Sequence, residues 1–345
     1  MEPEAAARHE LPGLDLDRLG PWFATRIPGA GGYLTAKLVA GGKSNLTYEV
    51  SDGSGTWIVR RPPLGHVLAT AHDMGREYRV MSALGGTDVP VPHMYAMCQE
   101  TDVLDAPFYV MEKVPGVPYR RASELEPLGP ERTRSISVAL VETLTTLHAV
   151  EPTAVGLADF GHPDGFLARQ VRRWRKQLDA SHSRDLPLAD ELHARLEADV
   201  PTESAPGIVH GDFRLDNVLV DGDRPTAVID WEMATLGDPL TDLALMVVYH
   251  RLGALLGAAS VADANTAPGF LTEDEVIDLY RSRSDRDLSS FGFYLGLASF
   301  KLAAIIEGIH YRFIQGQTVG AGFDRVGDAV DIMLEAGLAA LEEHR

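Results

Sequence analysis

The sequence predicts an α+β fold with two lobes, a small β-rich lobe followed by a larger and mainly helical one. Short alternating and β-branched runs beside glycine-rich turns dominate the first part, and apolar residues at helical spacing dominate from about residue 130. A length of 345 residues agrees with two domains or with one domain of two lobes. We therefore expect a first lobe over 1–112 and a second lobe over 113–345.

The first lobe is expected to be an antiparallel meander with one helix. Glycine-rich turns at 41–45 and 52–55 separate the first three predicted strands, which is typical of hairpins. Prolines at 90 and 92 interrupt the chain before the last strand. The predicted strands cover 34–39, 47–50, 57–60 and 108–111, and the predicted helix covers 72–84.

The second lobe is expected to be helical, with a small β region inside it. Three short β-like segments, 208–210, 218–220 and 227–230, follow a polar, helix-containing insertion at 185–206. Apolar spacing predicts helices over 131–148, 165–178, 238–256, 273–283, 289–315 and 323–344.

Composition narrows the function classes. The formal net charge of −19 argues against general nucleic-acid binding, because a phosphate backbone would be repelled. A single cysteine, Cys98, allows no intrachain disulfide and fits a reducing compartment. The segment 1–13 has neither a basic start nor an apolar stretch, so we expect no secretory signal. We expect a cytoplasmic protein.

The most apolar helical stretch, 294–309, contains Lys301 and Glu307. We expect it to be too short and too charged to span a membrane. No membrane partner is therefore predicted.

The segment 210–217, His-Gly-Asp-Phe-Arg-Leu-Asp-Asn, has the residue types of a phosphoryl-transfer site. Asp212 and Asn217, five residues apart, can face one cleft from a single loop, and Asp230 follows at the end of the next predicted strand. Phosphoryl transfer needs a carboxylate facing the attacking hydroxyl and oxygen ligands for magnesium. The alternative is a turn and a strand end without chemistry.

This motif order resembles the aminoglycoside phosphotransferase and choline kinase family, relatives of the protein kinases, over about residues 36–249. The resemblance implies a bilobal protein-kinase-like fold with ATP and Mg²⁺ as cofactors. It implies that Asp212 is the catalytic base and that Asn217 and Asp230 bind magnesium. It also places Arg214 where a lysine often meets the γ-phosphate, with a surface or interlobe salt bridge as the alternative.

The nucleotide contacts implied by the resemblance lie in the first lobe. Ser44 and Asn45 belong to a turn that resembles a phosphate-covering loop, although a plain hairpin would look the same. Arg60 stands where kinases carry the ATP-binding lysine, with Arg61 as the alternative. Glu77 begins the next helix and is expected to pair with Arg60.

Two further segments have roles in the family. The stretch 108–114 resembles the interlobe hinge, where Glu112 and Val114 would meet the adenine edge, unless it is a plain strand end. Asp242, after the metal loop, is expected to brace the catalytic loop.

The acceptor is the least determined part of the prediction. Segments at 57–65, 76–80, 106–112 and 210–217 resemble the kinase-like domain found fused to some acyl-CoA dehydrogenases, which implies a hydroxyacyl-CoA or hydroxy acid as the small-molecule acceptor and a stand-alone bacterial-type relative. One helix carries five cations in eight residues, which would suit a polyanionic acceptor or be a solvated helix face. They are Arg169, Arg172, Arg173, Arg175 and Lys176.

Other functions stay open. An aminoglycoside-type antibiotic phosphotransferase is the competing enzyme. Weak candidates for an acceptor pocket, on a later predicted helix, are Glu307, His310, Tyr311 and Arg312. A non-catalytic nucleotide-binding pseudokinase is favoured by arginine in place of lysine at position 60. A hydrolase using His210 and Asp212 is disfavoured, because the sequence has no G-x-S-x-G motif.

Overall fold

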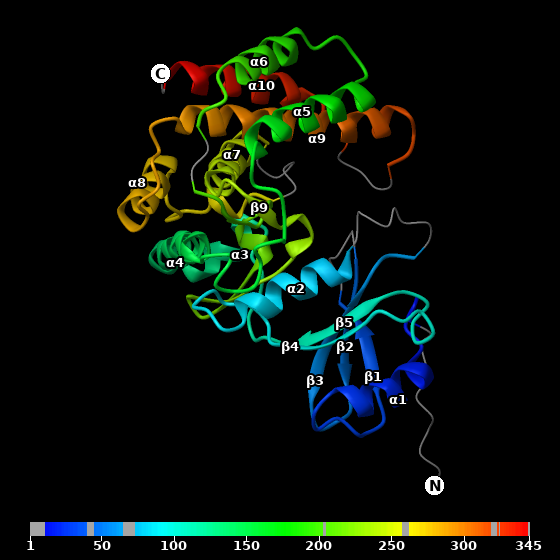
Figure 1. Ribbon diagram of the computed structural model, residues 1–345. Coiled ribbons are helices and arrows are strands. Elements are labelled where there is room, and N and C mark those ends of the chain that lie inside the picture. Colours follow the sequence, from blue (N-terminus) through cyan, green and yellow to red (C-terminus); the bar gives the residue numbers. More distant parts are fainter. Residues whose placement is uncertain are drawn as a thin grey trace. The chain divides into compact units, whose positions relative to one another are not determined.

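The computed structural model describes residues 11–39, 45–64, 73–202, 205–256, 262–318, 323 and 325–343. The chain forms two compact units. Unit 1 comprises Met1–Pro115 together with Asp230–Glu232, and unit 2 comprises Gly116–Ile229 together with Met233–Arg345. The predicted α+β class, with a β-rich part followed by a helical part, is confirmed (Figure 1).

Unit 1 contains a five-stranded antiparallel sheet in the order β1-β2-β3-β5-β4. Its strands are β1 (Thr35–Leu38), β2 (Leu46–Ser51), β3 (Thr56–Arg61), β4 (Met94–Cys98) and β5 (Phe108–Glu112). Two helices accompany the sheet, α1 (Leu16–Arg26) and α2 (Met74–Leu84). The sequence pattern predicted four of these strands and α2, but it missed β4 and α1.

Helix α1 belongs to the hydrophobic core of unit 1. It begins at Asp15, whose side chain accepts hydrogen bonds from two backbone N–H groups of the first turn. Phe23 is buried and meets the Trp57 ring edge-to-face at 5.2 Å, and Trp22 meets Phe108 at 4.8 Å. Each aromatic side chain buried in this way contributes about 1.5–3 kcal/mol to folding.

Strand β3 carries two arginines on opposite faces. Side chains alternate across a strand, and the buried positions are Trp57, Val59 and Arg61. Arg60 therefore lies on the other face, where its backbone pairs with Tyr109 of β5. This alternation gives the two arginines different partners.

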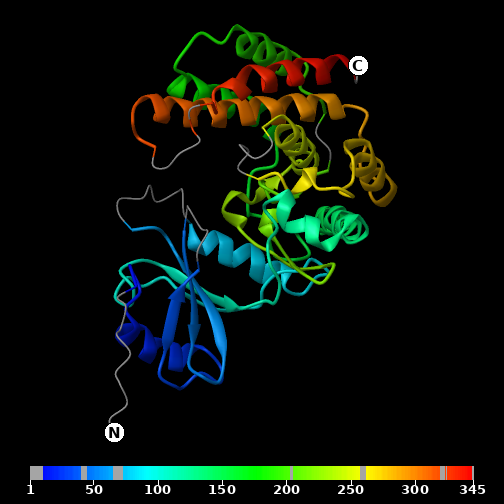
Figure 2. The ribbon, with the colours of Figure 1, turned by 180° about the vertical axis from the view of Figure 1, so that it is seen from behind.

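Unit 2 is mainly helical (Figure 2). Its helices are α3 (Ala122–Leu125), α4 (Pro130–Ala149), α5 (Phe166–Ser181), α6 (Pro187–Ala198), α7 (Leu240–Leu256), α8 (Glu273–Arg283), α9 (Phe291–Ile314) and α10 (Asp328–Glu343). Two small antiparallel sheets pair β6 (Gly207–Val209) with β9 (Thr235–Gly237), and β7 (Val218–Asp221) with β8 (Arg224–Val228). Only β9 and the short α3 were not predicted.

Helix α9 is longer than the apolar stretch seen in the sequence. It has 24 residues, and within the described part of the chain it is the one helix long and apolar enough to cross a membrane, so the prediction that it is too short was wrong. Of its most apolar window, 83% is buried against the rest of the protein. It packs against α10, α7 and α5 (Figures 1 and 2), as the core helix of a globular unit does.

Candidate active site

The side chain of Asp242, on α7, holds the loop between β6 and β7 in place through two hydrogen bonds. Its two carboxylate oxygens accept the backbone N–H groups of His210 (2.6 Å) and Gly211 (2.8 Å). Burial alone would raise the pKa of Asp242, but the hydrogen bond and charge of His148 and the bond from the loop backbone lower it. Asp242 therefore stays ionised and braces this loop, as the family resemblance implies.

Gly211 has no room for a side chain. Its φ of 86° lies in the left-handed region, and a Cβ there would come within 2.8 Å of the Met233 Cβ and 2.9 Å of the Met233 carbonyl oxygen. Its own carbonyl accepts a hydrogen bond from Lys301 Nζ of α9 at 2.8 Å. The backbone just before Asp212 is thereby held on two sides.

Asp212 has both carboxylate oxygens hydrogen-bonded and is still open to solvent. Oδ1 accepts the hydroxyl of Tyr249 at 2.9 Å, and Oδ2 accepts Nδ2 of Asn217 at 3.1 Å. Nε of Arg214 lies 3.5 Å from Oδ2. Because 28% of its side chain is exposed, the carboxylate can reach a substrate while its orientation is fixed.

The residues predicted to bind magnesium have suitable oxygens. Both described hydrogen bonds of the Asn217 amide use Nδ2, and the second goes to the Asp212 carbonyl at 2.9 Å, so Oδ1 is left for a hard cation. The backbone N–H of Ile229 donates to the Asn217 carbonyl at 2.9 Å. Asp230 is the next residue along the chain, and its backbone has a φ of 66°. Asn217 and Asp230 each carry an oxygen of the kind that magnesium prefers, and a magnesium site formed by them stays a prediction.

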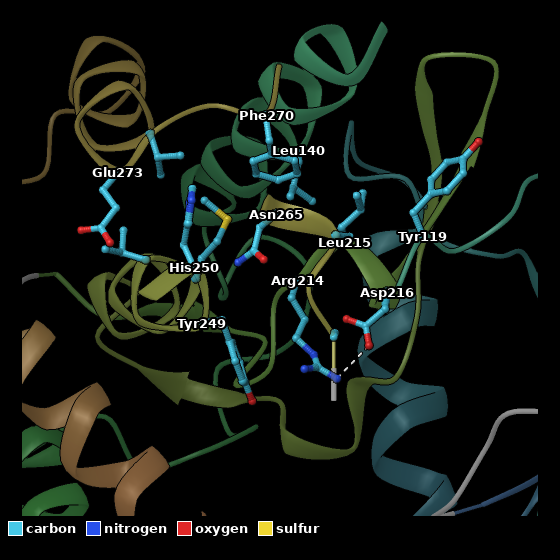
Figure 3. A pocket seen from close by; sticks show the side chains of 15 residues that line it. Tyr119, Leu140, Arg214, Leu215, Asp216, Tyr249, His250, Asn265, Phe270 and Glu273 are labelled. Atoms are coloured by element: carbon cyan, nitrogen blue, oxygen red, sulfur yellow. Dashed lines mark hydrogen bonds and ion pairs between the residues drawn. The ribbon is translucent and has the colours of Figure 1, made fainter. Parts of the chain in front are cut away.

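Arg214 is both ion-paired and adjacent to the carboxylate of Asp212. Its Nη2 donates to Asp216 Oδ2 at 2.8 Å, and its guanidinium carbon lies 4.8 Å from the centre of the Tyr249 ring (Figure 3). The salt-bridge alternative is therefore present within unit 2. A contact with the γ-phosphate stays a prediction.

In unit 1, Arg60 joins two carboxylates. Its Nε lies 3.2 Å from Glu77 Oε2, and its Nη2 lies 2.5 Å from Asp230 Oδ1. Burial raises the pKa of Glu77, and the charge of Arg60 opposes that rise. The predicted pairing of Glu77 with Arg60 is present, and its role in nucleotide binding stays a prediction.

The alternative cation, Arg61, is used for structure. Its Nη1 donates to the carbonyls of Leu104 (2.8 Å) and Gly13 (2.5 Å), and its side chain lies in the interior of unit 1. An arginine committed to buried carbonyls is unsuited to phosphate. Arg60 is therefore the better candidate of the two.

Asn45 contacts protein side chains. It is buried, and its Nδ2 donates to Glu77 Oε1 at 3.1 Å and to Glu232 Oε2 at 3.4 Å. It therefore links two acidic side chains of unit 1. Ser44, the other predicted member of this turn, lies outside the described residues, as does the rest of 41–44.

The predicted adenine segment is partly committed to the sheet. The Glu112 N–H donates to the His93 carbonyl at 2.8 Å, and the Glu112 carboxylate accepts the His93 N–H at 3.1 Å. An adenine contact by the Glu112 N–H would have to replace this bond. Its carbonyl and the backbone of Val114, two residues further, are better candidates.

A pocket in unit 2 lies directly beside the loop 210–217, and no sequence pattern indicated it. Gly211 and Asp242 line it together with Trp174, and two cations, Arg173 and Lys301, also line it. Lys301 Nζ lies 5.3 Å from the centre of the Trp174 ring, and burial lowers the pKa of Lys301. In the sequence Lys301 looks like an interruption of an apolar helix, so no local pattern points to this pocket.

The other predicted acceptor residues lie elsewhere. Arg169 donates to the carbonyls of His162 and Asp164, and Arg175 pairs with Asp179 at 2.8 Å. Of the five clustered cations, only Arg173 lines this pocket.

Glu307 does not line this pocket either. Its carboxylate accepts the hydroxyl of Ser183 at 2.7 Å and lies 3.4 Å from Arg184. It belongs to a buried polar cluster of its own.

Comparison with known proteins gives one consistent family. The family model described as "Phosphotransferase enzyme family" matches residues 35–276. Acyl-CoA dehydrogenase family member 11 of Rattus norvegicus is 33% identical over 336 residues, which cover 94% of this chain and 43% of that protein. The chain thus spans less than half the length of this relative.

Solved structures agree with this result. A protein of Ralstonia eutropha, described as an aminoglycoside phosphotransferase, is 32% identical, with a TM-score of 0.84 over 96% of this chain and 99% of its own. A thermostable mutant of aminoglycoside phosphotransferase APH(4)-Ia, solved with AMP-PNP and hygromycin B, shares the fold at 15% identity, with a TM-score of 0.60 over 93% of this chain and 98% of its own. The predicted resemblance is confirmed, and the chain belongs to the phosphotransferase enzyme family.

Proposed function

We propose that this protein is an ATP-dependent small-molecule kinase that transfers the γ-phosphate to a hydroxyl of an anionic acceptor, such as a hydroxy acid or a hydroxyacyl-CoA. The observation that carries this proposal is the Asp212 carboxylate, fixed by Tyr249 and Asn217 yet exposed over 28% of its side chain. A base for a substrate hydroxyl needs this combination of fixed orientation and access.

In the proposed reaction, the acceptor hydroxyl donates its proton to Asp212 as its oxygen bonds to the γ-phosphorus. The bond between that phosphorus and the β,γ-bridging oxygen breaks, and ADP leaves. Arg214, 3.5 Å from the base, would neutralise charge on the transferring group. Asn217 and Asp230 would hold Mg²⁺, which supplies further charge neutralisation when bound.

The proposed nucleotide contacts rest on unit 1. Arg60 is held by Glu77 at 3.2 Å, the partner that the kinase-like arrangement requires for its ATP-binding cation. An arginine can contact the α- and β-phosphates through two N–H groups at once. This pair supports a catalytic protein over the pseudokinase alternative.

The choice of an anionic acceptor rests on the pocket beside the catalytic loop. It carries the cations Arg173 and Lys301, and Asp242, the one carboxylate among its lining residues, is used by the loop backbone. A polycationic aminoglycoside would meet like charge here, whereas a carboxylate or phosphate would be attracted. The apolar lining around Trp174 and Phe166 suits an acyl chain.

The test is magnesium-dependent ADP release with hydroxyacyl-CoAs, free hydroxy acids, amino alcohols and aminoglycosides. We expect stimulation by the anionic acceptors. In Asp212→Ala we expect a loss of about 10²–10⁴-fold with ATP binding largely retained, since general-base catalysis contributes that much. Asp230→Ala should weaken binding of the magnesium–nucleotide complex as well. Near wild-type turnover of Asp212→Ala would refute the assignment of the base.

A matched pair of variants tests the acceptor pocket. Lys301→Met should raise KM for an anionic acceptor roughly tenfold, the size of one lost charged contact of about 1.4 kcal/mol. Lys176→Met removes an exposed cation of α5 that does not line the pocket, so it should leave KM unchanged. Stimulation by aminoglycosides alone would overturn the anionic acceptor.

A further inference from the structure

We propose that Tyr249 is a positioning residue that sets the orientation of the catalytic base and of the neighbouring arginine together. Its place is on α7, far along the chain from the catalytic loop, and no motif of that loop includes it. The inference rests on the proposed function for the reaction that it serves, but the geometry that it claims can be tested separately.

The hydroxyl of Tyr249 makes the first contact. It donates to Asp212 Oδ1 at 2.9 Å from a helix whose inner side is packed, with Val247 and Val248 buried. Burial, and next the charge of Asp212, raise the pKa of Tyr249 well above its ordinary value, so the hydroxyl keeps the proton that it donates. The donor is therefore both fixed and permanent.

The ring of Tyr249 makes the second contact. The guanidinium of Arg214 lies over it at 4.8 Å, and Asp216 holds the same guanidinium through a 2.8 Å hydrogen bond. Figure 3 shows Tyr249 and Arg214 side by side, with the bond from Arg214 to Asp216. Nε of Arg120 lies 3.5 Å from the same Asp216 oxygen, so Asp216 is paired with both arginines.

These contacts suit the proposed base, Asp212, because they fix its carboxylate and still leave lone pairs for a substrate hydroxyl. A carboxylate side chain turns about two bonds, and two donors on different oxygens, Tyr249 and Asn217, fix both rotations of Asp212. Each carboxylate oxygen has two lone pairs, so each bond leaves one for the substrate hydroxyl. A misplacement of about 1 Å in such a group costs about 100-fold in rate.

The test compares Tyr249→Phe, which keeps the ring, with Tyr249→Leu, which removes the ring as well. We expect Tyr249→Phe to lower kcat about tenfold with KM for ATP within about twofold, because binding contacts remain while orientation is lost. Tyr249→Leu should lower kcat further, since Arg214 also loses its support. The matched control is Tyr48→Phe, which removes a hydroxyl bonded to the Pro12 carbonyl in unit 1 and should lower Tm without lowering kcat.

A crystal structure of Tyr249→Phe tests the geometry without any acceptor. We expect the Asp212 carboxylate to leave its present rotamer or to occupy two. An unchanged Asp212 rotamer would overturn the proposal, and so would an unchanged kcat in Tyr249→Phe. If the wild type turns over none of the acceptors, the proposed function fails, and this structure still decides the role of Tyr249.

Discussion

Two carboxylates, one in each unit, are held by the same three kinds of side chain. The carboxylate of Glu77 in unit 1 accepts hydrogen bonds from Tyr109 at 2.9 Å and from Asn45 at 3.1 Å, and it forms an ion pair with Arg60 at 3.2 Å. The carboxylate of Asp212 in unit 2 accepts hydrogen bonds from a tyrosine at 2.9 Å and from an asparagine at 3.1 Å, and it forms an ion pair with an arginine at 3.5 Å. The donor sets match, but 1% of the Glu77 side chain is exposed against 28% for Asp212.

The difference in side-chain exposure distinguishes a structural role, for Glu77, from the proposed catalytic role of Asp212. Around Glu77 the donors complete a buried ion pair, so the carboxylate can meet no substrate and serves to hold Arg60 in place. Around Asp212 the same donors fix the orientation of a group that solvent can reach, as the proposed role of a base requires. A hydrogen-bonded carboxylate is therefore informative about catalysis only when its burial is known.

The largest effect on stability is expected at Glu77. Glu77→Gln should lower the free energy of unfolding by about 3 kcal/mol, the lower end of the range for breaking a buried ion pair, because Arg60 loses its buried partner Glu77 but keeps Asp230. Asp212→Asn should change this free energy by less than about 1 kcal/mol, since its partners are partly solvated. Urea unfolding of both variants measures the contrast. Equal losses in the two variants would break the comparison.

A third carboxylate, that of Asp242, has a histidine as its partner, so its surroundings change with pH. His148 is buried, 3.5 Å from Asp242, and burial lowers the pKa of His148 below its ordinary value of 6.5. As the pH falls below 6.5, the unfolded chain binds a proton that the folded chain excludes, so stability falls. The slope is at most about 1.4 kcal/mol per pH unit.

Unfolding free energies measured between pH 7.5 and pH 5.5 test this sign. The wild type should lose stability over that range, and His148→Gln should show a flatter profile. A wild type that gains stability as the pH falls would contradict the lowered pKa.

The smallest effect is expected for an exposed carboxylate with good partners. Glu275 closes a capping box with Thr272 at the start of α8, and the hydrogen bond from Arg134 lowers the pKa of Glu275 to about 2. Its contribution is present above pH 4.5 and is lost as the pH falls toward 2. Glu275→Gln should shift the urea midpoint at pH 7 far less than Glu77→Gln does. A comparable shift would refute the role given to burial.

Local pattern was sufficient for most of the fold. Periodicity located α8 at its observed bounds and most other helices to within a few residues, because amphipathic spacing is a local property. Strand β4, with four of its five residues only half buried, has no alternation to detect. Helix α1 was missed because Pro21 lies inside it, and a proline within a helical pattern normally marks a helix end or a kink.

In the candidate site, too, residues that belong to a local motif could be predicted from the sequence, and residues placed by long-range contacts could not. Asp212, Asn217 and Asp230 could be proposed from the sequence because their spacing along the chain is a motif, and Glu77 because a helix start follows the predicted cation; their roles stay predictions. Tyr249 and Lys301, which we propose as further site residues, could not be predicted because their contacts join residues 37 and 90 positions apart. Asn45, expected to meet phosphate, proved to be bonded to two acidic side chains through contacts that no local pattern encodes.

The return of Asp230–Glu232 to unit 1 matters for anyone who divides the gene into expression fragments. A fragment that ended at Pro115 would contain every strand of the five-stranded sheet. It would still lack Asp230, the 2.5 Å partner of Arg60, and Glu232, one of the two partners of Asn45. A recombinant N-terminal part therefore has to carry residues 230–232 as a grafted segment if Arg60 and Asn45 are to keep these partners.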